Sequence, residues 1–417
     1  MDKFIIQGGT PLCGQVRVSG SKNATLPIMA ASILSCGEVI LNEVPQLEDI
    51  TVMSEALELL GAAVKREKDT LIIDGRSVSN CALPEHISRR MRASNLLMGA
   101  LLGRFGQAKV AFPGGCAIGS RPMDLHIKGF RSLGYDISEG YGFLEGQAAN
   151  IHGQEILLDI PSVGATENIM MAASMVPGTT IIRNAAREPE IVDLQNFINR
   201  MGAKIKGAGL DTIRIEGVKR LGGVEHTVIP DRIEAGTYMV AAAISGGDIW
   251  ITDALFEHLQ PIIAKLMEIG IEIIPWSEGL RVVGRGCRYL PTDIKTMPYP
   301  GFPTDMQPQM MALLSTVSGT SVIVETIFEN RFMHVQELRR MGADIKVEGR
   351  VAIIKGNHLE GATVEASDLR AGAALVLAGL GAWGETQVLG LDHIDRGYEN
   401  MHQKLQQLGA AITRKSV

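Results

Sequence analysis

Aromatic residues make up only 5% of this chain of 417 residues, and the chain contains no run of basic residues interleaved with aromatic ones. The formal net charge is −6 at pH 7. Nucleic-acid-binding proteins usually carry a clustered positive charge, so the composition argues against a nucleic-acid partner. Any anionic ligand must therefore be bound by a small local group of cations.

Long apolar runs are also missing. No stretch approaches the roughly 18 to 20 apolar residues that cross a bilayer, and the start MDKFIIQGGTP has no apolar core of a secretion signal. We therefore expect a cytoplasmic protein without a membrane partner. Five cysteines, at positions 13, 36, 81, 116 and 287, show neither CxxC nor metal-ligand spacing, so we expect free thiols rather than disulfides or a structural zinc.

Cofactor motifs are absent as well. No GxxxxGK[ST] occurs, and no GxGxxG lies between a strand and a helix with an acid downstream. The nine histidines include no HExxH. We expect no nucleoside triphosphate, no dinucleotide cofactor and no catalytic metal.

What the chain does contain is a unit of roughly 70 residues that recurs six times. Each copy has an amphipathic helix that ends in a hydrophobe-Gly-hydrophobe pattern. The glycines are Gly61, Gly134, Gly202, Gly270, Gly342 and Gly409. Each suits the left-handed position just past a helix, and a β-rich stretch lies on either side of the helix.

Each copy also opens with a second helix that is apolar nearly all round, which is typical of a buried helix. These segments are 21–34, 91–102, 162–176, 231–244, 303–317 and 367–380. In five copies the last strand ends in a further glycine, whereas the sixth copy stops before that strand. The segment Phe4–Gly8 is an unassigned strand of the right type, so we expect it to complete the sixth repeat. A chain of this length exceeds one core, and two bodies of three repeats are the natural division.

This pattern resembles the enolpyruvyl transferase family, whose members build two inside-out α/β domains from six βαβαββ-type units around a substrate cleft. The resemblance covers the whole chain and implies an α/β fold of two inside-out α/β barrel domains. One domain would span 22–229 and carry the loop around Cys116. The other would combine 1–21 with 230–417. The same fold also serves shikimate-phosphate enzymes and RNA 3′-phosphate cyclases, so the site residues must decide the function.

The strongest local motif is PGGCAIGSRPMDLH, residues 113–126, in which Cys116 lies among glycines before a helix. A lone cysteine is most often an inert, buried hydrophobe, but such a loop is a poor core and a good lid. Arg121 could lower the pKa of a nearby thiol. The motif resembles the catalytic loop of the family branch that acts on UDP-N-acetylglucosamine, which implies a reactive Cys116 and a phosphate-binding Arg121.

The same comparison disfavours the shikimate-phosphate branch, which carries a GNAGT-type helix start. The corresponding segment here is Met91–Asn95, and Arg92 in it is expected to bind the nucleotide sugar. A second motif, GSKNA at 20–24, brings Lys22 to a helix start that favours anions. Taken locally, it is more often a solvated lysine behind a Ser21 cap. The resemblance implies that Lys22 binds the phosphate of phosphoenolpyruvate and that Asn23 contacts the sugar or the phosphate.

Asp305, in FPTDMQ, lies at the start of a buried helix, where an aspartate often only caps the helix. Asp231 has the same local chemistry, and we assign it a structural role. The resemblance makes Asp305 the general base for the sugar hydroxyl. Three arginines, Arg331, Arg370 and Arg396, fall in equivalent parts of successive repeats. Each alone could be a surface residue, but together they suit the carboxylate and phosphate of phosphoenolpyruvate.

The family reaction is addition followed by elimination. Asp305 would accept the proton of the 3′-hydroxyl as its oxygen attacks C2 of phosphoenolpyruvate, and Cys116 would protonate C3 or hold a covalent adduct. Lys22, Arg121 and Arg396 would stabilise the departing phosphate. The remaining sugar contacts implied by the resemblance are Pro122, Met123, Asp124, Leu125, Ser162, Val163 and Ile327.

This reaction would commit the sugar to peptidoglycan precursor synthesis, with phosphoenolpyruvate and UDP-N-acetylglucosamine as the small-molecule partners. Two alternatives stay open. One is transfer to shikimate 3-phosphate, and the other is a paralogue that binds the nucleotide sugar without turnover. His126, His334 and His393 are expected to be structural.

Overall fold

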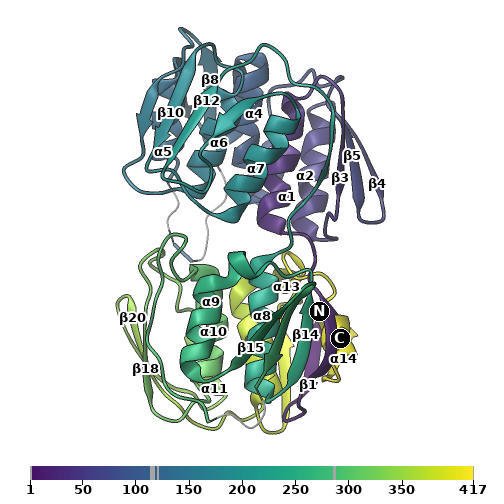
Figure 1. The fold of residues 1–417 in the computed structure, drawn as a ribbon, viewed down its shortest axis with the longest axis vertical. Helices are drawn as coiled ribbons and strands as arrows, with labels where there is room; N and C mark the ends of the chain where they lie inside the picture. The colour runs from purple at the N-terminus through teal and green to yellow at the C-terminus, as the bar shows by residue number, and fades with distance from the viewer. Residues whose placement is uncertain (1, 113–117, 120–121, 285–287, 417) are drawn as a thin grey trace. The chain divides into compact units, whose positions relative to one another are not determined.

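The computed structural model describes residues 2–112, 118–119, 122–284 and 288–416 (Figure 1). Contacts divide these residues into two compact units. The C-terminal unit comprises 2–19, 118–119 and 230–416, and the N-terminal unit comprises 20–112 and 122–229. Gly20 and Ser21 thus group with the N-terminal unit, two residues before the expected boundary at residue 22. Each unit has its own hydrophobic core.

The N-terminal unit contains three sheets. The first joins β13 (Val224–Thr227), β3 (Glu38–Asn42), β5 (Thr70–Asp74) and β4 (Ala63–Glu67). The second joins β6 (Gln107–Ala111), β8 (Phe143–Ala148) and β7 (Tyr135–Gly140), and the third joins β11 (Lys204–Lys206), β12 (Thr212–Glu216), β10 (Thr179–Arg183) and β9 (Glu155–Leu157). The buried helices are α1 (Lys22–Ala31), α4 (Leu96–Phe105) and α6 (Val163–Ala173); the amphipathic ones are α2 (Glu48–Leu59), α5 (Asp124–Ser132) and α7 (Pro189–Arg200).

The C-terminal unit repeats this plan with three four-stranded sheets. These are β15 (Glu272–Trp276), β16 (Gly279–Val283), β14 (Asp248–Thr252) and β2 (Cys13–Arg17); β17 (Ile294–Lys295), β18 (Thr320–Val324), β20 (Val351–Lys355) and β19 (Asp344–Glu348); and β21 (Thr363–Glu365), β22 (Glu385–Leu389), β1 (Asp2–Gln7) and β23 (Ala411–Ser416). The buried helices are α8 (Arg232–Ser245), α10 (Gln307–Leu314) and α12 (Leu369–Gly381). The other main helices are α9 (Phe256–Ile269), α11 (Val335–Arg340) and α14 (Met401–Gln407).

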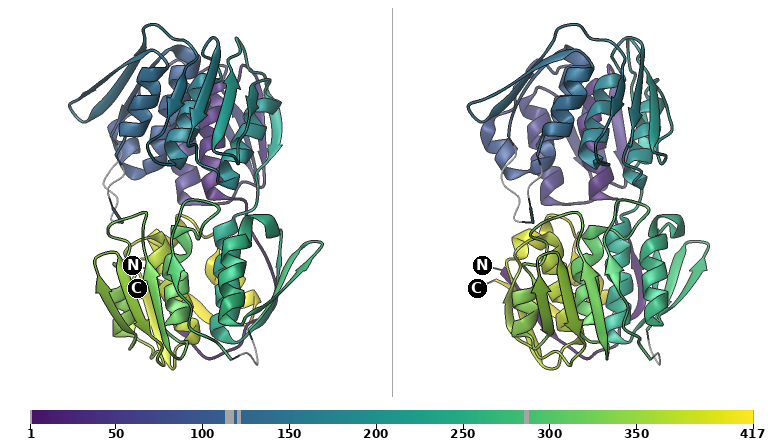
Figure 2. Two further views of the ribbon diagram at one scale, coloured as in Figure 1. Left: turned by 60° about the vertical axis from the view of Figure 1, so that its left-hand side comes forward. Right: turned by 90° about the vertical axis from the view of Figure 1, so that its left-hand side faces the viewer.

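In Figures 1 and 2 the sheets of each unit lie around a central group of helices. The short helices are η1 (Ser32–Leu34), α3 (Glu85–Arg90), η2 (Arg92–Asn95), η3 (Thr304–Met306) and α13 (Leu391–Asp395). The expected α/β fold of six βαβαββ units is confirmed. Its strands form six separate sheets of three or four strands among the described residues rather than closed barrels.

The predicted helix-ending glycines are also confirmed. All six have a positive φ, between 89° at Gly134 and 113° at Gly202. Four of the six buried helices begin at side-chain caps: Ser21 caps α1, Ser162 caps α6, Asp231 caps α8 and Asp368 caps α12. Asp231 therefore has the structural role expected of it. Cys13, Cys36 and Cys81 are free thiols, as expected, whereas Cys116 and Cys287 lie outside the described residues.

The N-terminal strand completes the sixth repeat, as predicted. β1 lies between β22 and β23 and is antiparallel to both, with Asp2 opposite Ser416. Gly8 then passes so close to the end of α12 that an added Cβ would lie 2.0 Å from the Ala382 carbonyl oxygen. Gly217 and Gly356 make the same kind of approach in the third and fifth repeats, to the carbonyl oxygens of Val176 and Val317.

Two strands exchange places between the units, which the sequence pattern did not predict. β2 precedes the first repeat but pairs in parallel with β14 of the fourth. β13 precedes the fourth repeat but pairs in parallel with β3 of the first. Each unit thus completes its own sheets. No helix among the described residues has the length and apolar character needed to cross a membrane.

Candidate active site

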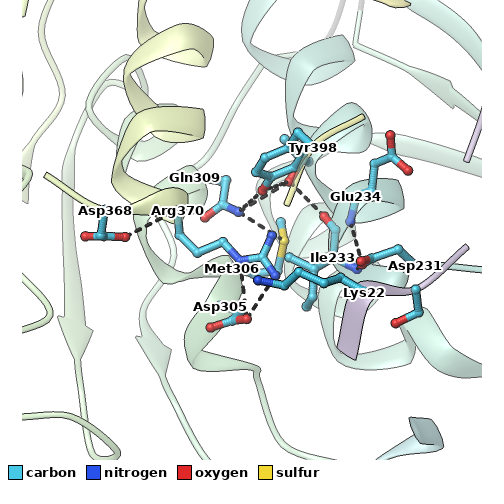
Figure 3. Close-up of polar contacts among 12 residues, drawn as sticks. Lys22, Asp231, Ile233, Glu234, Asp305, Met306, Gln309, Asp368, Arg370 and Tyr398 are labelled. Carbon is cyan, nitrogen blue, oxygen red and sulfur yellow. Dashed lines mark hydrogen bonds and ion pairs between the residues drawn. The ribbon is translucent and has the colours of Figure 1, made fainter. Parts of the chain in front are cut away.

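Asp305 forms the centre of a charged group in the C-terminal unit. Its Oδ1 accepts a hydrogen bond from Arg331 Nη2 at 2.9 Å. Its Oδ2 accepts from Arg370 Nη2 at 3.0 Å (Figure 3). The two arginine side chains are only 2% and 4% exposed, whereas that of Asp305 is 28% exposed. The carboxylate thus lies at the accessible edge of two buried cations.

This arrangement has a direct chemical consequence. Two guanidinium groups within hydrogen-bonding distance favour the ionised form of a carboxylate, which is the form that can accept a proton. Asp305 lies in η3, whose cap is Pro303, while Met306 is the cap of α10. The alternative of a simple helix cap therefore does not describe Asp305.

Arg370 is held from two sides. Asp368 caps α12 by accepting hydrogen bonds from the backbone N–H groups of Arg370 and Ala371, at 2.9 and 3.0 Å. The guanidinium lies over the ring of Tyr398, 5.3 Å from its centroid. The Tyr398 hydroxyl in turn accepts from Gln309 Nε2 at 3.1 Å (Figure 3). A buried polar network thus fixes the cation that faces Asp305.

The three predicted arginines are not equivalent in the repeats, which corrects the sequence analysis. Arg331 follows β18 and Arg396 follows β22, which are matching strands of successive repeats. Arg370 instead belongs to the start of α12. Arg396 is half-buried at the end of α13. Arg331 and Arg370 are joined to Asp305 by the ion pairs described above.

In the N-terminal unit, predicted sugar-binding residues gather at three helix starts. Arg92 begins η2, Asp124 and Leu125 begin α5, and Ser162 caps α6 ahead of Val163. Pro122 and Asp124 are exposed, whereas Met123 and Leu125 are buried.

His126 joins these helix starts. Its Nδ1 lies 2.9 Å from Asn168 Nδ2, which also donates to the Asn95 carbonyl at 3.2 Å, and a Cβ added at Gly164 would lie 3.2 Å from the His126 ring. Burial, with a smaller contribution from Arg92, lowers the pKa of His126 to about 4. The imidazole is therefore neutral at pH 7, as a structural histidine would be.

Lys22 lies at the start of α1, behind the cap that Ser21 provides. Its Nζ is 3.2 Å from Asp49 Oδ2, and the two side chains are only 12% and 7% exposed. The lysine is therefore not simply solvated. Asn23 is half-buried beside it.

The predicted reactive residue Cys116 and the predicted phosphate ligand Arg121 lie outside the described residues. The nearby residue Ile118 belongs to the C-terminal unit, and its carbonyl accepts from the N–H of Asn330 at 3.0 Å. Asn330 directly precedes Arg331. The described part of this loop thus contacts the segment that carries Arg331.

The structure adds residues that the sequence did not indicate. Asp49 pairs with Lys22, Tyr398 supports Arg370, and Glu325 accepts hydrogen bonds from Thr304 and from the backbone of Ile327. None occurs in a recognisable motif, because each role arises from contacts between distant segments. Within the described ranges, no group of three His, Cys, Asp or Glu residues could hold a metal ion.

Comparisons with known proteins identify the family of this chain. The family model for EPSP synthase (3-phosphoshikimate 1-carboxyvinyltransferase) matches residues 6–405. The chain is 58% identical over 414 residues to UDP-N-acetylglucosamine 1-carboxyvinyltransferase 1 of Caldanaerobacter subterraneus subsp. tengcongensis, covering 99% of both proteins. It is 56% identical over 418 residues to UDP-N-acetylglucosamine 1-carboxyvinyltransferase 2 of Carboxydothermus hydrogenoformans, covering 100% of both.

Solved structures show the same architecture. The enolpyruvyl transferase NikO from Streptomyces tendae superposes with a TM-score of 0.90 at 25% identity, over 100% of this chain and 99% of that one. EPSP synthase from Acinetobacter baumannii superposes with a TM-score of 0.76 at 18% identity, over 100% of both chains, and so supports the fold alone. The chain therefore belongs to the EPSP synthase family of enolpyruvyl transferases.

Proposed function

We propose that this protein transfers the enolpyruvyl group of phosphoenolpyruvate to the 3′-hydroxyl of UDP-N-acetylglucosamine and releases phosphate. The observation that carries the choice of acceptor is the full-length identity of 54 to 58% to relatives named for that sugar nucleotide. Identity to the solved EPSP synthase is only 18%. The shikimate-phosphate alternative is correspondingly disfavoured.

The chemistry rests on Asp305 as general base. An ionised, partly exposed carboxylate beside two buried arginines can take the hydroxyl proton as the oxygen attacks C2 of phosphoenolpyruvate. Cys116 would supply the proton to C3. Lys22, Arg121 and Arg396 would stabilise the phosphate as it leaves.

We also propose that the two units are the two domains of the enzyme. Phosphoenolpyruvate would be bound by cations, and the nucleotide sugar in part by the residues gathered around His126. The proposed phosphoenolpyruvate ligands are Lys22, Arg121, Arg331, Arg370 and Arg396. The proposed sugar ligands are Arg92, Pro122, Met123, Asp124, Leu125, Ser162, Val163, Asp305 and Ile327. Asn23 is proposed to contact the sugar or the phosphate.

This activity would serve peptidoglycan precursor synthesis in the cytoplasm. The test is phosphate release from phosphoenolpyruvate with each acceptor offered separately. Release with UDP-N-acetylglucosamine and none with shikimate 3-phosphate is expected. Release with shikimate 3-phosphate would support the first alternative. Binding of UDP-N-acetylglucosamine without any release would support the sensor alternative.

A further inference from the structure

Glu325, directly after β18, is a buried carboxylate that the proposed reaction does not use. Its side chain accepts four hydrogen bonds, although the residue is only 1% exposed. Oε1 accepts from Thr296 Oγ1 at 2.8 Å and from the backbone N–H groups of Ile327 and Phe328 at 2.8 and 3.2 Å. Oε2 accepts from Thr304 Oγ1 at 2.8 Å. Removal of such an acceptor leaves buried donors unpaired, which lowers the stability of the folded state.

These partners lie in the two segments that carry the Asp305–Arg331 ion pair. Thr304 directly precedes Asp305 in η3, and Ile327 and Phe328 begin the segment that leads to Arg331. One carboxylate therefore joins the turn that carries the base to the segment that carries its arginine partner. Displacement of a catalytic carboxylate by about 1 Å can lower the reaction rate by about two orders of magnitude. A residue that fixes the position of Asp305 can therefore affect the rate.

The other repeats offer an internal comparison. At the position directly after the matching strand, four of the other five repeats place a residue in the left-handed conformation: Glu43, Asn184, Asp253 and Gly390 have φ of 59°, 55°, 54° and 74°. Phe112, at this position in the second repeat, does not have a positive φ. Glu325 does not adopt this conformation. In the repeat that carries Asp305 and Arg331, the chain instead turns around a buried side chain, so this contact is not a general requirement of the repeat.

We propose that Glu325 is a positioning residue, which sets the geometry of Asp305 against Arg331 and holds the backbone of Ile327 in place. This proposal rests on the proposed function for its kinetic test only. Its structural test is independent of any substrate. Peptides covering 325–332 should exchange amide hydrogens slowly in the wild-type protein and much faster in Glu325→Ala.

The kinetic test uses a double-mutant cycle with phosphate release as the readout. Glu325→Ala should lower kcat about 10- to 100-fold, whereas Glu325→Gln, which keeps an acceptor for the two N–H groups, should recover most of it. In an Asp305→Asn background, Glu325→Ala should cause no further loss, because the residue acts through Asp305. If Glu325 had a purely structural role, Glu325→Ala would lower kcat by the same factor in the wild-type and the Asp305→Asn backgrounds.

Asp253→Ala is the matched control, since Asp253 holds the same place in the fourth repeat and forms an exposed ion pair with Arg17. It should leave kcat within about twofold of wild type.

If Glu325→Ala is insoluble, Thr296→Val removes one donor to Oε1 and should show the same non-additivity on a smaller scale. Unchanged amide exchange in the mutant, or equal losses in the two backgrounds, would overturn the proposal. A wild-type protein inactive with UDP-N-acetylglucosamine would refute the proposed function and leave the exchange test standing.

Discussion

At the scale of single residues, Asp305 has two roles that cannot be separated by inspection. Buried guanidinium groups need a counter-charge, and Asp305 is the carboxylate paired with both Arg331 and Arg370. The same residue is the proposed base. Substitution of Asp305 should therefore affect both stability and rate, and only the rate effect bears on catalysis.

Asp305→Asn should lower kcat at least about 100-fold, because an amide keeps the size of the side chain but cannot accept the proton. The melting temperature should also fall by several degrees, since two buried arginines lose their counter-charge. Steady-state kinetics and calorimetric titration with UDP-N-acetylglucosamine separate the effects: binding should persist while turnover is lost. Normal turnover would mean that Asp305 only neutralises the arginines.

Cys116 should react with a small phosphonate epoxide such as fosfomycin, which resembles phosphoenolpyruvate and would be guided to this thiol by Lys22, Arg121 and Arg396. Peptide mass mapping with the nucleotide sugar present should find the added mass on Cys116 alone. Cys116→Asp should stay active and escape inactivation, because a carboxylic acid can donate a proton but is a poor nucleophile toward an epoxide. Cys116→Ser should lose activity. Labelling of Cys13, Cys36 or Cys81 instead would show that the reactive thiol is assigned wrongly.

His126 makes the N-terminal unit sensitive to acid. Its pKa of about 4 lies below the ordinary histidine value of 6.5, so between these pH values the unfolded chain binds a proton that the folded chain does not bind. The contribution of neutral His126 to the free energy of unfolding is fully present above pH 6.5 and is lost as the pH falls toward 4. The slope is at most about 1.4 kcal/mol per pH unit. Urea unfolding at several pH values should therefore show a flatter dependence for His126→Gln. His152→Gln, at an exposed position, should leave the wild-type dependence unchanged, and an equal effect of both would contradict the assignment.

The limits of sequence reasoning are visible at this scale. The resemblance brought Asp305, Arg331 and Arg370 into one expected group, and the structure joins them directly. The role of Glu325 could not be predicted, because its four hydrogen-bond donors come from segments that are close only in the folded chain. Arg370 was misplaced among the repeats, since periodicity in sequence did not distinguish the start of a buried helix from the segment after a strand.

At the scale of elements, the pattern of glycines was informative because each one answers a local requirement. A glycine just past a helix needs a positive φ, and this can be inferred from neighbouring residues alone. Gly217 meets a different requirement, since an added Cβ would lie 1.6 Å from the Val176 carbonyl oxygen. The sequence indicated a glycine at the end of that strand but not the close contact that demands it.

The two kinds of glycine should respond differently to the same substitution. Gly202 has a φ of 113° and nothing within 4 Å of an added Cβ, so Gly202→Ala should cost only the backbone strain of about 1 to 2 kcal/mol. Gly217→Ala must displace the backbone of Val176 and should cost at least about 4 kcal/mol. Urea unfolding measures both. Equal losses would mean that the close approach at Gly217 relaxes without penalty.

At the scale of the whole molecule, the exchange of β2 and β13 shows why topology did not follow from the repeats. Both strands precede a repeat in the same way, so their sequences give no reason for either to pair with a distant repeat. Pairing of β13 with β3 completes a sheet within the N-terminal unit, and pairing of β2 with β14 completes one within the C-terminal unit. Each of the two strands therefore pairs within its own unit rather than with the repeat that it precedes.

The position of β1 gives the last prediction, which concerns chain order. β1 has the place of the missing last strand of the sixth repeat, and its pairing with β23 sets Asp2 opposite Ser416. A two-residue Asn-Gly turn can join antiparallel strands at such a point. A permuted chain that begins at Thr10 and continues from Ser416 through Asn-Gly to Asp2–Gly9 should therefore fold, keep most of its phosphate-releasing activity and melt within a few degrees of wild type.

The control for the permuted chain is a chain that begins at Thr10 and lacks residues 2–9 altogether. It leaves β22 and β23 without the strand between them and should melt well below wild type or fail to fold. A control as stable as the permuted chain would mean that β1 contributes nothing to the sixth sheet.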